Sequence, residues 1–307
     1  MTPIVSDQKA TDNEAKRRHD HIDAFKGLLT LQMILAHCLQ FFTRLDSGSP
    51  LYYLSEYINL TTFSGFFFAF GYVAWLAYLQ KPFAEVWQRL LKNTLRLLAA
   101  YYVSAFAYRI FIDEIFVFRE NVTEILIFQH IPGWSEFLLS FALLMIMMLI
   151  LQPFMRRAGR FLVPVIIIVS IASTFVDVSI DKPIIASIFG RSDFSLFPVL
   201  PYSLHFAIGI YVAQKPDFKK VPLLLVSAAG TVAFIVAMGR DGMPSRFPPS
   251  ILWVTGSMLF LLAYYYFSLW LTRRFSTSNL CRIGRESLFY LLVSNWLIFS
   301  VKSSNFF

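Results

Sequence analysis

The chain has 307 residues, of which 57% are hydrophobic, 17% aromatic and 15% charged, and its formal net charge is +8. About a quarter of the residues in a soluble domain are charged, so this composition excludes an ordinary soluble protein and indicates one embedded in a membrane. The lysines and arginines lie in short clusters between apolar runs, which is typical of charges that set membrane topology, so we expect no nucleic-acid partner.

The N-terminal segment differs from the rest of the chain. Residues 1–20 are polar, have no apolar periodicity and include a basic cluster at 16–18. They predict a disordered or surface-lying cytoplasmic tail, followed by one membrane domain over residues 21–307. The first apolar run is long and has no small-residue cleavage site, so we expect it to be kept as the first span rather than removed as a signal peptide.

The membrane domain contains a series of apolar runs, each near the ~20 residues that a transmembrane helix needs. They lie at about 24–44, 51–79, 93–112, 134–152, 161–178, 197–213, 221–239, 249–271 and 286–303. Two short semi-apolar segments, 115–131 and 181–190, are candidates for re-entrant segments or for a tenth span. We therefore predict an all-α polytopic membrane protein, a bundle of nine to ten transmembrane helices.

Lys and Arg residues are distributed unequally between the two sides that this order of spans defines. More than twice as many fall on the side that carries the N-terminus as on the opposite side. Because cytoplasmic loops are enriched in Lys and Arg, the asymmetry predicts a cytoplasmic N-terminus and a C-terminus on the outer side.

The first apolar run carries a mostly polar stripe along one face. At about 100° per residue, the residues within roughly 40° of one line are Lys26, Thr30, Met33, His37, Gln40 and Arg44. An ionisable group that faces lipid costs about 2.5 to 3.5 kcal/mol on insertion scales, so we expect this face to line a cavity. Lys26 precedes His37 by eleven residues, about 16 Å along a helix, which places the cation at one membrane edge and the imidazole well inside.

Two residues of this stripe each allow two interpretations. His37 either bonds a carbonyl of a neighbouring helix and has only a packing role, or acts as a general base, because burial disfavours its charged form and leaves it able to take a proton from a hydroxyl. Lys26 either extends to the membrane interface as a topological charge, or binds phosphate with the help of Arg89, Lys92 and Arg96.

Short motifs in order along the chain carry a resemblance to a known family. Asp23-x-x-Lys26-Gly27 with His37 resembles the first helix of the acyltransferase-3 membrane family, in which the basic residue is usually Arg. Lys at this position is common among relatives that resemble the heparan-alpha-glucosaminide N-acetyltransferase group. Similar segments also include Arg246-Phe-Pro248-Pro249-Ser250, Phe67-Phe68-Ala-Phe-Gly71-Tyr72, Pro201-Tyr202 with Gly209, and Gly284-Arg285-Glu-Ser287-Leu-Phe-Tyr290.

The resemblance implies an enzyme that moves an acyl group from cytoplasmic acyl-CoA to a carbohydrate hydroxyl or amine across the membrane, and we expect an O-acyltransferase of the bacterial inner membrane. It would move an acyl group, in the simplest case acetyl, from cytoplasmic acyl-CoA to a hydroxyl of a cell-surface or exported glycan. In this hypothesis His37 is the general base, Gln40 stabilises the oxyanion and Glu136 orients His37, while a route through an acyl-histidine stays open. The residues expected to bind acyl-CoA are Lys26, Gly27, Thr30 and Arg96, and those expected to bind the acceptor are Arg44, Trp134, Arg246 and Ser250.

Partners and rival functions follow from the same features. We expect acyl-CoA as a co-substrate, no tightly bound cofactor and no metal, a glycan or glycolipid acceptor, and membrane lipid; a homodimer stays open. The two cysteines, Cys38 and Cys281, indicate neither a disulfide framework nor a thiolate metal site.

The alternative is a transporter or flippase in which Lys26, His37 and Arg44 line a conduction path, although no pair of broken helices appears in matching halves. A non-catalytic sensor or assembly subunit is the third reading.

Overall fold

A computed structural model describes residues 4–113, 118–176, 182–190, 197–214 and 221–304. Within these residues the secondary structure is helical, with no β-strand. The helices are α1 (Ile4–Phe42), α2 (Pro50–Ala74) with the π-helical turn η1 (Trp75–Leu79), α3 (Phe83–Phe111), α4 (Phe118–Leu126), α5 (Glu136–Ala158), the 3₁₀ turn η2 (Gly159–Phe161), α6 (Leu162–Ser173), α7 (Pro183–Phe189), α8 (Val199–Gln214), α9 (Val221–Asp241), α10 (Ile251–Gly256), α11 (Met258–Arg274), α12 (Ser278–Arg285) and α13 (Ser287–Ser303).

Most predicted spans coincide with these helices to within a few residues. Two spans and the N-terminal tail differ from the prediction in an informative way. α3 begins at Phe83 rather than near 93, because its first turns expose Arg89 and Lys92 and so lack an apolar signal. The run at 249–271 is divided into α10 and α11 at Ser257. We expected residues 1–20 to be a disordered or surface-lying tail, whereas α1 begins at Ile4; the division into tail and membrane domain stays a prediction.

Several helices have the length and composition of membrane spans. Among the described residues, five segments qualify: Asp20–Phe42, Pro50–Leu79, Glu136–Ser173, Val221–Asp241 and Ile251–Arg274. The apolar helices α8 and α13 are shorter, and the long segment Glu136–Ser173 contains both α5 and α6, which were predicted as separate spans. The all-helical membrane fold is thus confirmed, but these criteria do not confirm nine to ten spans.

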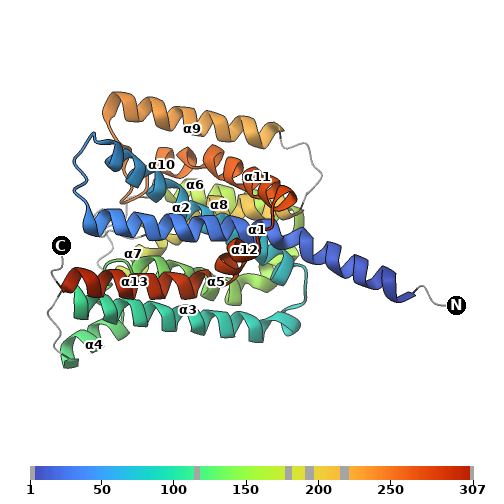
Figure 1. The fold of residues 1–307 in the computed structure, drawn as a ribbon, viewed down its shortest axis with the longest axis horizontal. Helices are drawn as coiled ribbons and strands as arrows, with labels where there is room; N and C mark the ends of the chain where they lie inside the picture. The colour runs from blue at the N-terminus through green and yellow to red at the C-terminus, as the bar shows by residue number, and fades with distance from the viewer. Residues whose placement is uncertain (1–3, 114–117, 177–181, 191–196, 215–220, 305–307) are drawn as a thin grey trace.

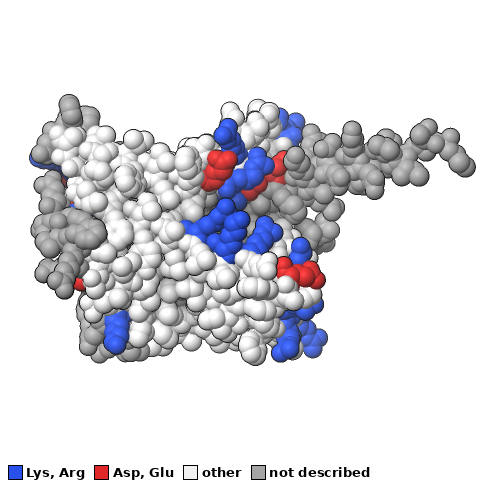
Figure 2. Space-filling view, turned by 90° about the horizontal axis from the view of Figure 1, so that it is seen from below, with Lys and Arg blue, Asp and Glu red and all other residues white. Residues whose placement is uncertain are grey.

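The long helices lie side by side along one axis of the molecule (Figure 1). The first part of α1 projects beyond the bundle at one end, and the C-terminus lies at the opposite end. α9 lies at one edge and α3 at the other, with α13 beside α1. Figure 2 shows that the Lys and Arg side chains on one face gather mostly toward the end from which α1 projects, while much of that face is uncharged.

Glycines allow a very close contact between α2 and α8. A Cβ atom on Gly71 of α2 would lie 2.0 Å from the carbonyl oxygen of Phe206, and one on Gly209 of α8 would lie 2.0 Å from that of Phe68. Small residues at helix crossings let two backbones approach within van der Waals distance, which is a main source of helix association in lipid. The pair α2–α8 is therefore closely packed, and α1, α6 and α10 contact one or both of its helices.

Local sequence signals account for where the elements near the cavity begin. Ser49 accepts a hydrogen bond from the Tyr52 amide at 3.1 Å and Pro50 occupies the first turn, so α2 begins at Pro50. Ser250 caps α10 in the same way, accepting from the Trp253 amide at 3.2 Å. These caps hold the loops before α2 and α10 at the same end of the bundle.

Candidate active site

The polar stripe on α1 faces protein rather than lipid. Thr30 and Met33 are buried, while Leu31 and Leu35, on the other side of the helix, are 48% and 45% exposed. The predicted cavity is present next to the C-terminal half of α1, at the end of the bundle opposite to the projecting N-terminal helix. Its volume is about 440 Å³.

The lining of this cavity combines aromatic rings with a few polar groups. The polar side chains are His37, Gln40, Asn59, Thr62, Glu136 and Arg246, and the aromatic ones are Phe63, Trp134, Phe137, Phe197 and Phe247. They come from α1, α2 and α5 and from the segments before α5, α8 and α10. A concave apolar site with a small number of convergent polar groups is the usual form of a small-molecule site.

His37 is held by a residue of the last helix. Its Nδ1 lies 2.7 Å from Oδ1 of Asn295, which is fully buried on α13. We expected Glu136 to orient His37, but the hydrogen-bond partner in the structure is Asn295; Glu136 lines the same cavity without a hydrogen bond between the two. The amide oxygen accepts from Nδ1–H, so Nε2 is the ring nitrogen available to act as a base.

A chain of hydrogen bonds fixes the amide of Gln40. Its Oε1 accepts from Nε1 of Trp134 at 3.2 Å, and its Nε2 donates to Oδ1 of Asn59 at 3.3 Å. Asn59 in turn donates through Nδ2 to Oε1 of Glu56 at 3.3 Å. One of the two N–H groups of Gln40 is therefore used inside the protein, and the other remains for a ligand.

Trp134 has an unusual backbone conformation. Its φ is +57°, in the left-handed region that non-glycine residues seldom adopt. The indole ring stacks on Tyr108 of α3, with centroids 5.4 Å apart at 22°, and packs against Phe41 of α1 at 4.7 Å. Strained residues that are held by their surroundings concentrate at functional sites, which supports a role for Trp134 in the cavity.

Glu136 and Arg246 provide the ionisable groups of the cavity beside His37. Oε2 of Glu136 and Nε of Arg246 are buried without a hydrogen-bond partner among the described residues. The Arg246 guanidinium lies over the rings of Phe197 and Phe247, 5.1 and 4.7 Å from their centroids. Burial lowers the pKa of Arg246. The nearby Tyr202, Glu56 and Glu136 oppose this effect by raising the pKa. The cavity thus presents both a cation and a carboxyl group to a ligand.

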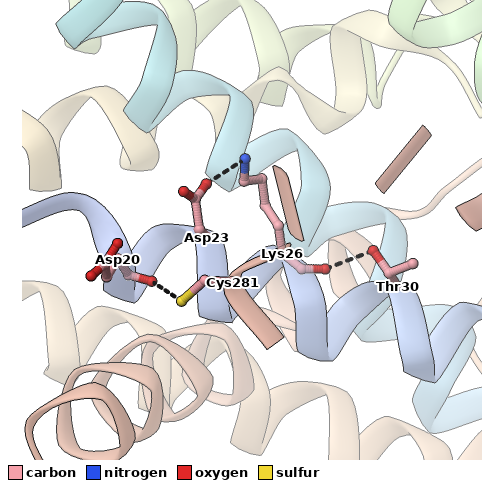
Figure 3. A network of polar contacts seen from close by, with 5 residues as sticks. All are labelled: Asp20, Asp23, Lys26, Thr30 and Cys281. Atoms are coloured by element: carbon pink, nitrogen blue, oxygen red, sulfur yellow. Dashed lines mark hydrogen bonds and ion pairs between the residues drawn. The ribbon is translucent and has the colours of Figure 1, made fainter. Parts of the chain in front are cut away.

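Three of the residues expected to bind acyl-CoA, Lys26, Gly27 and Thr30, lie on α1 before the cavity; Figure 3 shows Lys26 and Thr30. Lys26 forms an ion pair with Asp23 at 2.8 Å, and Thr30 donates to the Lys26 carbonyl at 2.8 Å. Gly27 allows contact with another helix, because a Cβ there would lie 2.3 Å from the carbonyl oxygen of Leu280 on α12. Arg96 is exposed on a different helix, α3, beside Lys92.

Two residues expected to bind the acceptor lie outside the cavity lining. Arg44 is exposed in the segment after α1, and Ser250 is occupied as the cap of α10. Within the described residues there is no group of three or more His, Cys, Asp or Glu side chains that could hold a metal ion. The roles assigned to all of these side chains remain predictions.

Comparison with known proteins identifies the family. The family model described as heparan-alpha-glucosaminide N-acetyltransferase, catalytic, matches residues 18–244, well over half of the chain. The chain belongs to this family. The resemblance seen in the sequence is therefore confirmed, and with it a membrane acyltransferase of the acetyltransferase type. Searches of curated proteins and of solved structures gave no significant match.

The region that matches this family contains most of the cavity but not all of it. His37, Gln40 and Glu136 lie within residues 18–244, whereas Arg246 and Asn295 lie beyond the match. Asn295 is the residue that our reading of the sequence missed. A signal was present, since an amide side chain in an apolar span requires a partner, but nothing local indicates that the partner is His37.

Proposed function

We propose that this protein moves an acyl group, in the simplest case acetyl, from cytoplasmic acyl-CoA to a hydroxyl of a cell-surface or exported glycan. It would act in a bacterial inner membrane with its N-terminus in the cytoplasm. The single observation that carries the proposal is a histidine, His37, oriented by a hydrogen bond and lining a cavity in a chain of an acetyltransferase family.

The proposed reaction is a direct transfer. Nε2 of His37 takes the proton of the acceptor hydroxyl as its oxygen attacks the thioester carbonyl. The new C–O bond forms, the C–S bond breaks, and the departing CoA sulfur receives the proton from the imidazolium. The second N–H of Gln40 is a candidate donor to the oxyanion, because Trp134 and Asn59 hold the amide in place.

Donor binding is proposed near Lys26, about three turns before His37 on α1. Lys26 and His37 are about 16 Å apart along the helix, which suits a phosphate group at Lys26 and an acyl carbonyl at His37. Asp23 already holds Lys26 in position, so the phosphates would have to share this lysine or displace the carboxylate. Arg96 would add positive charge from α3, while Gly27 and Thr30 would support the shape of the helix rather than contact the donor.

Replacement of His37 tests the proposal. We expect His37→Ala to lower transfer at least a hundredfold, because a positioned general base contributes about 10² to 10⁴ in rate. Binding of acyl-CoA to the purified protein should persist. Cys38→Ala, on the same turn of α1, is the matched control and should retain activity. Undiminished transfer by His37→Ala would refute the mechanism, and a transporter built on Lys26, His37 and Arg44 would bind no acyl-CoA at all.

An amine acceptor is the second candidate, because the matching family is described as a glucosaminide N-acetyltransferase. The same base and the same cavity would serve an amino group. The linkage of the product separates the two acceptors, since mild alkali cleaves an ester and leaves an amide intact. Alkali-labile acetyl on the product would identify the hydroxyl, and alkali-stable acetyl the amine.

A further inference from the structure

Asn295 occupies an unusual position for an amide side chain. It lies on α13, a mostly apolar helix, and no part of it is exposed. Leu291, one turn earlier on the same helix, lines the cavity, so Asn295 lies on the side of α13 that faces it. Its Oδ1 lies 2.7 Å from Nδ1 of His37, whereas its Nδ2 is buried with no partner among the described residues.

This arrangement is a poor one for packing alone. A buried amide that satisfies only one of its two polar ends destabilises the fold relative to an apolar side chain of similar size. Its one hydrogen bond among the described residues joins α13 to His37, which lines the cavity. The cost of burying Asn295 is therefore best explained by its effect on the orientation and protonation of the His37 ring.

We propose that Asn295 is a positioning residue that fixes the tautomer of His37. With Oδ1 facing Nδ1, the ring proton lies on Nδ1, and the lone pair of Nε2 is directed to the substrates. If Nδ2 faced the ring instead, Nδ1 would have to accept and Nε2 would carry the proton, so it could not act as a base. This inference rests on the proposed function, in which His37 takes the acceptor proton.

The charged groups around His37 do not compete with Asn295 as the hydrogen-bond partner of the ring. Glu136, on α5, and Arg246, in the segment before α10, line the same cavity. On α2, Glu56 accepts from Asn59, which in turn accepts from Gln40. None of these three groups forms a hydrogen bond with the ring among the described residues, so the tautomer depends on Asn295.

Three substitutions test the inference in a transfer assay on purified protein, over a range of pH. Asn295→Leu removes the acceptor while keeping the volume, and we expect kcat to fall roughly ten- to hundredfold with little change in the KM for acyl-CoA. Asn295→Asp can only accept, so it should enforce the same tautomer and retain most activity. Its negative charge stabilises the imidazolium, so the acidic limb of the pH profile should move to higher pH. Ser294→Ala, a neighbouring change that leaves His37 untouched, should behave as the wild type.

Each outcome has a defined meaning. Wild-type kcat and pH profile in Asn295→Leu, or an inactive but folded Asn295→Asp, would overturn the inference; binding of acyl-CoA reports on folding in each variant. Should Asn295→Leu fail to fold, the pH profile of Asn295→Asp decides alone, because a merely structural amide would not move it. His37→Ala in the same assay separates the two proposals: if it remains active the proposed function fails, and if it is inactive while Asn295→Leu is not, only the role of Asn295 fails.

Discussion

Single residues in the cavity are held by one another rather than by their own helices. Gln40 is bonded by Trp134 and by Asn59, and His37 by Asn295. Each of these bonds joins two elements, so each side chain has a direction that its own helix does not impose. A site whose polar groups are oriented before a ligand arrives does not have to order them during the reaction, which is how preorganised sites lower a barrier.

Trp134 offers a test of this arrangement. Trp134→Phe keeps an aromatic ring for stacking on Tyr108 but removes the N–H that holds Gln40. A single hydrogen bond is worth about 1 kcal/mol, so we expect kcat/KM for the acceptor to fall by roughly fivefold with acyl-CoA binding unchanged. Trp270→Phe, at a position 49% exposed on α11, is the control. Equal kinetics for the two variants would argue against a role for the indole N–H.

At the scale of elements, the close crossing of α2 and α8 determines the geometry of the cavity. α2 carries Asn59 and Thr62 into the lining, and α8 follows the segment that supplies Phe197. Because the backbones touch at Gly71 and Gly209, the two helices cannot slide or rotate without losing that contact. The positions of the cavity walls therefore depend on residues that do not reach the cavity.

Adding one methyl group at this crossing should disrupt the bundle. In Gly71→Ala the Cβ would lie 2.0 Å from the carbonyl oxygen of Phe206, a backbone atom that can move only with its helix. Overpacking of this kind costs about 1 to 3 kcal/mol or more, so we expect a lower thermal stability in detergent and a lower yield of folded protein. Gly239→Ala is the control, since no atom lies within 4 Å of that Cβ. Equal stability of both variants would contradict the contact.

At the scale of the whole molecule, the loops divide between two ends. The segment between α1 and α2 lies at the end opposite the projecting part of α1, and the segment between α11 and α12 lies at the other (Figure 1). The cavity adjoins the last turns of α1, which lead to the first end, and Lys26 precedes these turns along the helix. In a membrane crossed along this axis, the two substrates that we propose would approach from opposite sides.

Cysteine labelling tests that orientation. In a background of Cys38→Ser and Cys281→Ser, we expect Ser47→Cys, after α1, to react with an impermeant maleimide in intact cells. Ser276→Cys, before α12, should react only after the membrane is opened. Both serines are exposed, so burial does not interfere. The reverse pattern would place the N-terminus outside, and equal labelling in intact cells would contradict a bundle that spans the membrane.

The order of helices, the membrane class and the polar face of α1 follow from hydropathy and helical periodicity, which depend only on residues close together in the chain. His37, Gln40, Trp134, Glu136 and Arg246 were predicted as site residues from their types and positions, and they line one cavity. The pairing of His37 with Asn295 joins positions 258 residues apart. No local pattern in the sequence encodes this pairing. The packing of α13 against α1 decides which amide meets the His37 ring, and that packing follows only from the assembled bundle.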